Sequence, residues 1–194
     1  MKSIRRNQSP ISKIAQKGFT LVELLIVVII LAILAAIVVP QFASTTNDAR
    51  DSAADSTLAG MRAAIDLYYQ QHGNNYPGAL TAVPVAACTG TAGNGVATGG
   101  AGATAADAFM EQLSLYTDVN GGTCSIGDNT VYRFGPYLKK PDIPSDPYTA
   151  TAALVVVAAG DLLMTADADP GPGGFKYDSL TGKLILNLRA EETR

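Results

Sequence analysis

A run of sixteen residues without a polar side chain, 24–39, is the feature that most limits what this chain can fold into. The apolar character begins at Phe19, and after Glu23 no charged residue follows until Asp48. At about 1.5 Å per residue, a helix over this stretch is long enough to cross the roughly 30 Å hydrocarbon layer of a membrane. We therefore predict a transmembrane segment over residues 19–42.

The residues before this run are basic. Residues 1–18 hold five basic residues and no acidic one, and they end in Lys17-Gly18. An ordinary secretory signal is cut after its apolar region. Here the apparent processing point lies before it, so the mature protein would keep the apolar helix.

The charge of the two parts predicts how the chain is oriented. Without residues 1–18, nine basic residues face seventeen acidic ones, a formal charge of −8. The positive-inside rule then places the leader in the cytoplasm and the acidic remainder outside, as a single-pass protein of the inner membrane. Such an acidic protein is not expected to bind nucleic acid through its phosphates.

Residues 13–50, which include Gly18-Phe19-Thr20-Leu21-Val22-Glu23, resemble the prepilin signature of type IV pilins and of type II secretion pseudopilins. The resemblance implies that a prepilin peptidase cuts after Gly18 and methylates the new amine of Phe19. It further implies a non-enzymatic structural subunit that polymerises into a helical filament. Its partners would be copies of itself, an inner-membrane assembly platform and other minor pilins or pseudopilins.

Two residues of the apolar segment are candidate assembly residues. An unpaired acid costs about 2.5 kcal/mol or more near the bilayer centre and less near its surface, so Glu23 needs a partner. We predict that partner to be the Phe19 amine of a neighbouring subunit, with solvation at the membrane surface as the alternative. Pro40 predicts either a gentle kink that loosens in a filament or a harmless proline at the membrane exit.

The rest of the chain predicts an α+β fold. Residues 19–73 form one long helix whose second half is amphipathic, and residues 74–194 form a globular head with a small antiparallel sheet. The helix face that packs on the head is marked by residues three or four positions apart: Leu58, Met61, Ile65 and Tyr68.

Within the head, a short helix is expected at 104–116 and strands at 152–159, 174–177 and 183–188. Residues 81–106 are rich in glycine, alanine and threonine, which predicts an exposed loop that buries little.

Two groups of head residues are candidate sites. Cys88 and Cys124 are the only cysteines, and in the oxidising compartment outside the inner membrane we expect one disulfide; two cysteines alone cannot complete a metal site. Asp161, Asp167 and Asp169 are either calcium ligands, as the resemblance to major pseudopilins implies, or a solvated acidic loop. No other cofactor is expected.

A second resemblance bears on the function. Gly135-Pro136-Tyr137-Leu138 and Asp146-Pro147-Tyr148 are similar to the Gly-Pro-Tyr-Leu and Asp-Pro-Trp elements of the major type II secretion pseudopilin, with Tyr148 in place of tryptophan. It favours a periplasmic pseudopilus over an extracellular type IV pilus for motility or adhesion.

Two other functional classes compete with a filament subunit. A ligand-binding tip or adhesin subunit draws its support from the loop 81–106. An exported enzyme is disfavoured, because the sequence has one histidine, His72, and no recognisable nucleophile motif.

Processing between Gly18 and Phe19 is directly testable. Protein isolated from its native membrane should have the intact mass of the chain without residues 1–18 plus one methyl group, and Gly18→Val should block the cut. Assembled filaments made of the full-length chain would contradict this prediction.

Overall fold

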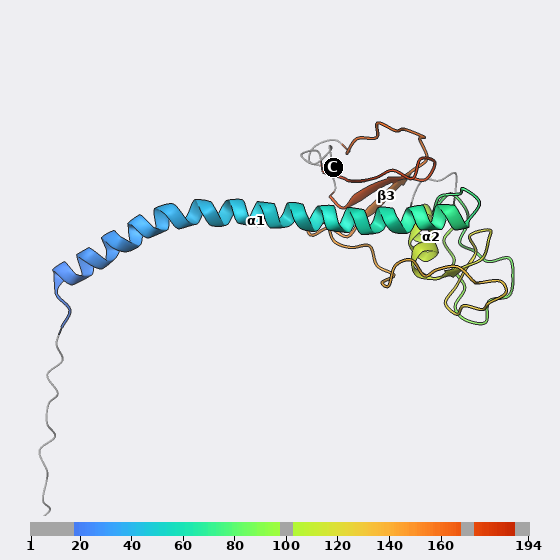
Figure 1. Ribbon diagram of the computed structural model, residues 1–194, viewed down its shortest axis with the longest axis horizontal. Coiled ribbons are helices and arrows are strands. Elements are labelled where there is room, and N and C mark those ends of the chain that lie inside the picture. The colour runs from blue at the N-terminus through green and yellow to red at the C-terminus, as the bar shows by residue number, and fades with distance from the viewer. Residues whose placement is uncertain (1–17, 98–102, 168–172, 189–194) are drawn as a thin grey trace, which may run out of the picture. The chain divides into compact units, whose positions relative to one another are not determined.

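The computed structural model describes residues 18–97, 103–167 and 173–188 (Figure 1). Its helices are α1 (Leu21–Gln71) and α2 (Ala103–Ser114). Its strands are β1 (Tyr116–Thr117), β2 (Thr123–Cys124), β3 (Leu154–Val157), β4 (Phe175–Asp178) and β5 (Leu184–Leu186). The chain divides into two units, residues 1–46 and 47–194, which we describe separately.

The described part of the first unit is the beginning of α1. Leu21–Val39 is long and apolar enough to cross a membrane, and none of its residues is buried. Large side chains such as Ile29 and Leu34 are about half exposed, on every side of the helix. A helix that is apolar all round is stable only inside an apolar surrounding, so this segment fits a membrane anchor.

The core of the second unit is built on one face of α1. The buried positions follow the helical repeat of three and four residues: Ala54, Leu58, Met61, Ile65, Tyr68 and His72. All of these except His72 belong to one core cluster with Phe109 and Leu113 of α2 and with Phe175, Tyr177 and Leu184 of the sheet. The amphipathic pattern of the sequence therefore located this face correctly.

The three-stranded sheet has the order β3-β4-β5. β4 and β5 form the antiparallel hairpin that the sequence predicted, with Phe175 opposite Leu186. β3 instead pairs with β4 in parallel, with Leu154 opposite Phe175. The α+β class is confirmed, but the sheet is mixed and not purely antiparallel, because the connection from 158 to 174 is long enough for a crossover.

A second, two-stranded sheet was not predicted. β1 and β2 pair antiparallel, with Thr117 opposite Thr123. The helix expected at 104–116 ends at Ser114, so Tyr116 belongs to a strand.

The segment after Thr81 is bound to the head more closely than expected. Ala82 is fully buried, and its carbonyl accepts a hydrogen bond of 2.8 Å from the Thr123 amide. The amides of Asn94 and Gly95 donate to the carboxylate of Glu111 on α2, at 3.0 and 2.9 Å. Most of 82–95 is exposed or half-buried, as expected of a loop that buries little, but Ala82, Asn94 and Gly95 attach it to the rest of the head by hydrogen bonds. Residues 98–102 lie outside the described chain.

Glycine makes this close packing possible. A Cβ atom on Gly95 would lie 2.3 Å from the Ala108 amide nitrogen, far inside van der Waals contact. The small residues here allow two backbone segments to lie close together. A loose loop can have the same composition, so composition alone does not distinguish the two.

His72 closes the end of α1. Its ring stacks on Tyr68 with 3.8 Å between centroids, and its Nδ1 lies 2.9 Å from the Tyr68 carbonyl oxygen. A carbonyl oxygen only accepts hydrogen bonds, so Nδ1 carries the hydrogen. Nε2 then accepts from the Thr117 hydroxyl, whose oxygen lies 3.0 Å from it. Burial lowers the pKa of His72 and outweighs the opposing effects of the Tyr68 and Asp118 backbones and the Asp118 charge.

The lowered pKa of His72 predicts a pH dependence of stability. The unfolded chain takes up the proton first, so the contribution of neutral His72 is complete above pH ~6.5 and is lost as the pH falls below it. The melting temperature of the head should therefore fall as the pH is lowered below about 6.5, and His72→Gln should remove that component. Equal slopes for both proteins would contradict the prediction.

Candidate assembly site

The first turn of α1 is closed by Thr20 and Glu23. The Glu23 amide donates to Thr20 Oγ1 at 3.2 Å. In return, Glu23 Oε2 accepts from the Thr20 amide at 3.1 Å and from its hydroxyl at 2.9 Å. This is a reciprocal capping box, in which two free amides of a helix start are satisfied by side chains.

The sequence reasoning missed Thr20. Its signal was present as Thr-x-x-Glu directly before an apolar run, the pattern of a capping box. Both bonds to Glu23 use Oε2, and within the described chain Oε1 makes no hydrogen bond. Glu23 therefore has a local structural role and still has an oxygen for a partner outside its own chain.

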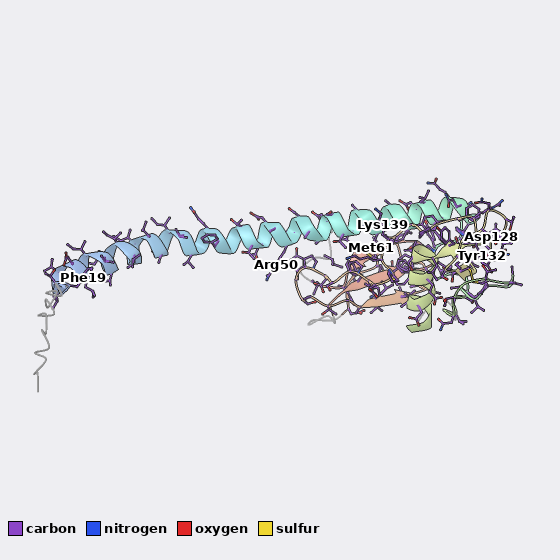
Figure 2. The ribbon with its side chains drawn as sticks, turned by 90° about the horizontal axis from the view of Figure 1, so that it is seen from below. Phe19, Arg50, Met61, Asp128, Tyr132 and Lys139 are labelled. Atoms are coloured by element: carbon purple, nitrogen blue, oxygen red, sulfur yellow. A yellow bond between two sulfur atoms is a disulfide. The ribbon has the colours of Figure 1, made fainter. Side chains whose placement is uncertain are left out.

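The other predicted processing and assembly residues lie along the same helix. Phe19 comes just before the cap and is 81% exposed, and Figure 2 shows it at the start of α1. A Cβ atom added to Gly18 would have no neighbouring atom within 4 Å. Pro40 lies inside α1, which continues to Gln71, so the proline does not end the helix.

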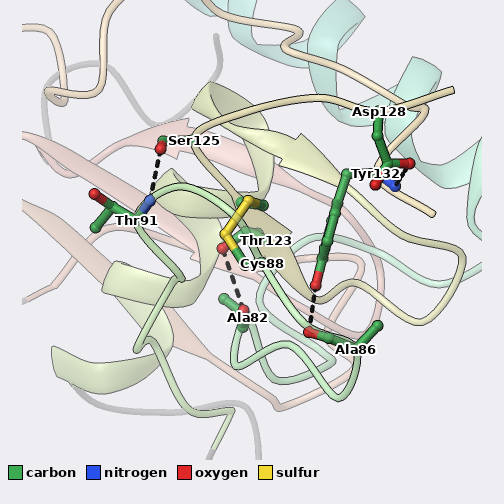
Figure 3. The surroundings of a disulfide bond; sticks show 9 residues. Ala82, Ala86, Cys88, Thr91, Thr123, Ser125, Asp128 and Tyr132 are labelled. Atoms are coloured by element: carbon green, nitrogen blue, oxygen red, sulfur yellow. Dashed lines mark hydrogen bonds between the residues drawn. A yellow bond between two sulfur atoms is a disulfide. The ribbon is translucent and has the colours of Figure 1, made fainter. Parts of the chain in front are cut away.

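The predicted disulfide is confirmed. Cys88 and Cys124 are bonded, with their Cα atoms 5.7 Å apart. Figure 3 shows the bonds that flank it: the Thr91 amide donates to Ser125 Oγ at 2.8 Å, and the Tyr132 hydroxyl donates to the Ala86 carbonyl at 2.7 Å. The bridge therefore joins the glycine-rich segment to β2 as part of a hydrogen-bonded contact.

The Gly-Pro-Tyr-Leu element holds the end of α2. The amides of Tyr137 and Leu138 both donate to the Leu113 carbonyl, at 2.9 and 2.8 Å. The Tyr137 hydroxyl donates to Gln71 Oε1 at the end of α1, at 2.7 Å. Burial raises the pKa of Tyr137 to about 12, so this hydroxyl is still protonated well above neutral pH.

The Asp-Pro-Tyr element is organised by the buried carboxylate of Asp146. It accepts hydrogen bonds from the amides of Tyr148, Thr149 and Gly174, at 2.9, 2.8 and 2.9 Å. Burial alone would raise the pKa of Asp146, but the bonds from Thr149, Gly174 and Tyr148 outweigh it and hold the pKa below its usual value. The Tyr148 hydroxyl donates to Asp51 of α1, so a tyrosine serves as an anchor where the resembled element has tryptophan.

The acidic residues predicted as calcium ligands have other partners. Asp167 forms an ion pair of 2.8 Å with Lys176 and accepts from the Asn187 side-chain amide at 2.9 Å. Asp161 Oδ1 accepts from the Leu163 amide at 2.7 Å. Among the described residues no group of three or more His, Cys, Asp or Glu is placed to hold a metal. Asp169 lies outside them, so the calcium site stays a prediction.

The comparisons with known proteins concern the N-terminal part of the chain. Residues 13–39 match the prokaryotic N-terminal methylation motif. The chain is 44% identical over 71 residues to the fimbrial protein of Neisseria meningitidis serogroup B, which is 37% of this chain and 41% of that protein. No solved structure matches the chain significantly.

Two further relatives come from different machines. The type II secretion system core protein G of Pseudomonas aeruginosa is 47% identical over 53 residues, 27% of this chain and 37% of the relative. The type IV narrow pilus major component PilA5 of Thermus thermophilus is 50% identical over 48 residues, 25% of this chain and 41% of the relative. The match therefore spans less than half the length of each of these relatives.

The class that fold and sequence define is a protein with a membrane-length N-terminal helix and an α+β head. More closely, its N-terminal segment carries the prokaryotic N-terminal methylation motif and is similar to those of a fimbrial protein and of a type II secretion core protein, which confirms the resemblance seen in the sequence.

Asp146 gives a stability test of the head. Asp146→Ala leaves several buried or half-buried amides without an acceptor, at a cost of about 1–3 kcal/mol each when nothing replaces it. We expect the free energy of unfolding to fall by about 2–4 kcal/mol. Asp142→Ala, an exposed acid on the same loop, is the matched control and should change it by less than about 0.5 kcal/mol. Denaturant unfolding measures both variants. Similar losses in the two would refute the role of Asp146 in organising this element.

Proposed function

We propose that this protein is a structural subunit of a helical filament of the type IV pilus or type II secretion pseudopilus kind. The observation that carries the proposal is the apolar first half of α1, exposed on all sides in the chain by itself. Such a helix needs lipid around it before assembly and other apolar helices around it afterwards. The methylation motif at the same helix start supports this use.

Processing and orientation follow from the same segment. A prepilin peptidase on the cytoplasmic side would cut after Gly18 and methylate Phe19, with the head on the far side of the inner membrane. An assembly platform and minor pilins or pseudopilins would then add subunits to the filament. Heterologous contacts between identical subunits produce such open helical growth.

Glu23 would set the register between subunits. Its capping bonds use Oε2 alone, and Oε1 is available to the Phe19 amine of a neighbour. In an apolar surrounding an acid and an amine stabilise each other strongly, because neither is solvated by water. A subunit that enters with this pair unmade leaves a charge unpaired, so the pair favours one axial position.

Between the two machines, we favour the secretion pseudopilus. The Gly135–Leu138 and Asp146–Tyr148 elements support it, because both are similar to elements of the major type II secretion pseudopilin. The pilus is the second candidate, and the similarity to fimbrial and pilus proteins supports it. Deleting the gene should abolish secretion of the exported proteins in the first case and surface filaments in the second.

Three substitutions separate the two roles of Glu23. Glu23→Val removes the charge and the bonds that the Glu23 carboxylate accepts, but keeps the bond from the residue-23 amide to Thr20 Oγ1. Glu23→Gln removes the charge and keeps an acceptor that a capping box tolerates. Thr20→Ala weakens the cap, by about 1 kcal/mol, and keeps the charge. If the charge sets register, Glu23→Val and Glu23→Gln should both lose filaments and Thr20→Ala should largely retain them.

Filament yield by shear fractionation is the measurement, with membrane insertion and leader cleavage checked in each variant. Normal yield from Glu23→Gln together with loss in Thr20→Ala would show that capping, not pairing, matters. Normal yield from all three would remove Glu23 from the assembly mechanism.

A further inference from the structure

Three polar side chains meet at the β4–β5 hairpin. Lys176 of β4 lies opposite Ile185 of β5, and the pairing continues past β5, where the Asn187 amide donates to the Gly174 carbonyl at 2.9 Å. Residues two positions apart on a strand share a face, so Lys176 and Asn187 are diagonal neighbours, within reach of a long side chain. Asp167, from the connection between β3 and β4, bonds to both of them.

The carboxylate of Asp167 holds the lysine and the asparagine through different oxygens. Oδ1 lies 2.8 Å from Lys176 Nζ, and Oδ2 accepts from Asn187 Nδ2 at 2.9 Å. Because both oxygens belong to one group, the lysine amine and the asparagine amide are held next to each other. Two reacting groups that are held together in one molecule react as if each were present at a very high concentration.

The backbone of Asp167 binds the remaining polar atom of the asparagine side chain. Its amide donates to Asn187 Oδ1 at 2.8 Å. This hydrogen bond polarises the side-chain carbonyl and stabilises the negative charge that Oδ1 gains when a nucleophile adds to Cγ. Asn187 is fully buried, so a nucleophile inside the protein has better access to Cγ than water has.

A purely structural network would also satisfy these atoms, since a buried amide needs its hydrogen bonds. The set of partners is more specific than that need requires. Lys176 Nζ also donates to the Thr165 carbonyl at 2.9 Å, so two contacts from the same segment fix the position of the amine. An amine as nucleophile, an amide as electrophile and a carboxylate that bonds to both are the groups that an amide-forming reaction uses.

In the resting state the lysine is charged. The hydrogen bond from Lys176, followed by that from Asn187, holds the pKa of Asp167 below its usual value, so an ammonium lies beside a carboxylate. The reaction starts when a proton moves from Nζ to Oδ1, which leaves an amine with a free electron pair. This state is rare, but the reaction occurs once in each chain and releases ammonia, so a slow rate is sufficient.

We propose that Lys176 and Asn187 become joined by an amide bond between their side chains, an isopeptide bond, with Asp167 as the group that transfers the protons. The bond would tie β5 covalently to β4. This inference concerns the head alone and does not depend on the proposed function as a filament subunit.

The atoms of the reaction balance without an oxidant, a metal or a second substrate. Lys176 Nζ adds to Asn187 Cγ, and the electron pair of the carbonyl moves onto Oδ1, where the Asp167 amide stabilises it. The Asp167 carboxyl gives its proton to Nδ2, the Cγ–Nδ2 bond breaks, and the carbonyl forms again. The departing ammonia takes up the surplus proton from Nζ. One ammonium and one amide are thus converted into one secondary amide and one ammonium ion.

Mass spectrometry of the full chain from its native cells tests the bond. After allowance for leader cleavage, methylation and the disulfide, the intact mass should be lower than the sequence mass by one ammonia. Trypsin does not cut after an acylated lysine, so the digest should contain one branched peptide in which residues 184–189 are attached to Lys176. Separate peptides with unmodified Lys176 and Asn187, both in protein from the cells and after long incubation at neutral pH, would overturn the proposal.

Two variants remove the reaction and keep the contacts similar. Lys176→Arg keeps the positive charge beside Asp167, but a guanidinium is always protonated and is no nucleophile. Asp167→Asn keeps the size of the side chain and removes the proton acceptor. Both should form the Cys88–Cys124 disulfide, which reports a folded head, and both should lack the branched peptide.

Lys183→Arg is the matched control, because Lys183 Nζ donates to the Leu162 carbonyl at 2.7 Å and takes no part in the reaction. It should form the isopeptide bond as the wild type does. An asparagine that precedes a glycine, such as Asn120, can lose ammonia by cyclising on its own backbone. A loss of ammonia that persists in Lys176→Arg, with no branched peptide in the wild type, would assign the mass change to such a site and refute the bond.

Discussion

One helix has to satisfy two different surroundings, and the rest of the molecule depends on how it does so. The first half of α1 is apolar on every side and exposed, which is compatible with lipid or with other apolar helices. The second half is apolar on one face only, and Leu58, Ile65 and Tyr68 bury that face in the head. The switch from one pattern to the other divides the chain into an anchor and a folded head.

The head owes its order to polar side chains as much as to strands, because its strands are only two to four residues long. Loops leave many backbone groups without ladder partners, and each buried one must be satisfied. Asp146 and Asp178 accept from amides far away in the sequence or across a turn. Gln112, fully buried, does the same in both directions: it accepts from the Gly78 amide and donates to the carbonyls of Leu80 and Gly121.

Features that depend on local pattern could be predicted from the sequence. The length of the apolar run predicted the membrane-length helix, the three-and-four spacing predicted its core face, and the turn signals before Gly182 predicted the hairpin of β4 and β5. The disulfide was predictable because two cysteines in an oxidising compartment leave one pairing.

Features that depend on contacts between distant residues could not be predicted in the same way. The parallel pairing of β3 is one, since strand direction is set by a long connection without periodicity. The attachment of 82–95 to Glu111 is another, because glycine-rich composition describes a loose loop and a closely packed one equally well. The capping box at Thr20 is different, because it depends on a local motif, Thr-x-x-Glu, that is visible in the sequence.

We propose that copies of this chain pack through their apolar helices, with Glu23 paired between subunits. A helical reconstruction by electron cryomicroscopy of filaments sheared from the native cell tests it most directly. We expect density that starts at a methylated Phe19, with its amine against Glu23 of an adjacent subunit and Leu21–Val39 enclosed by neighbouring copies. Filaments built from another protein, or a Glu23 that contacts only its own Thr20 while no amine approaches it, would contradict the account.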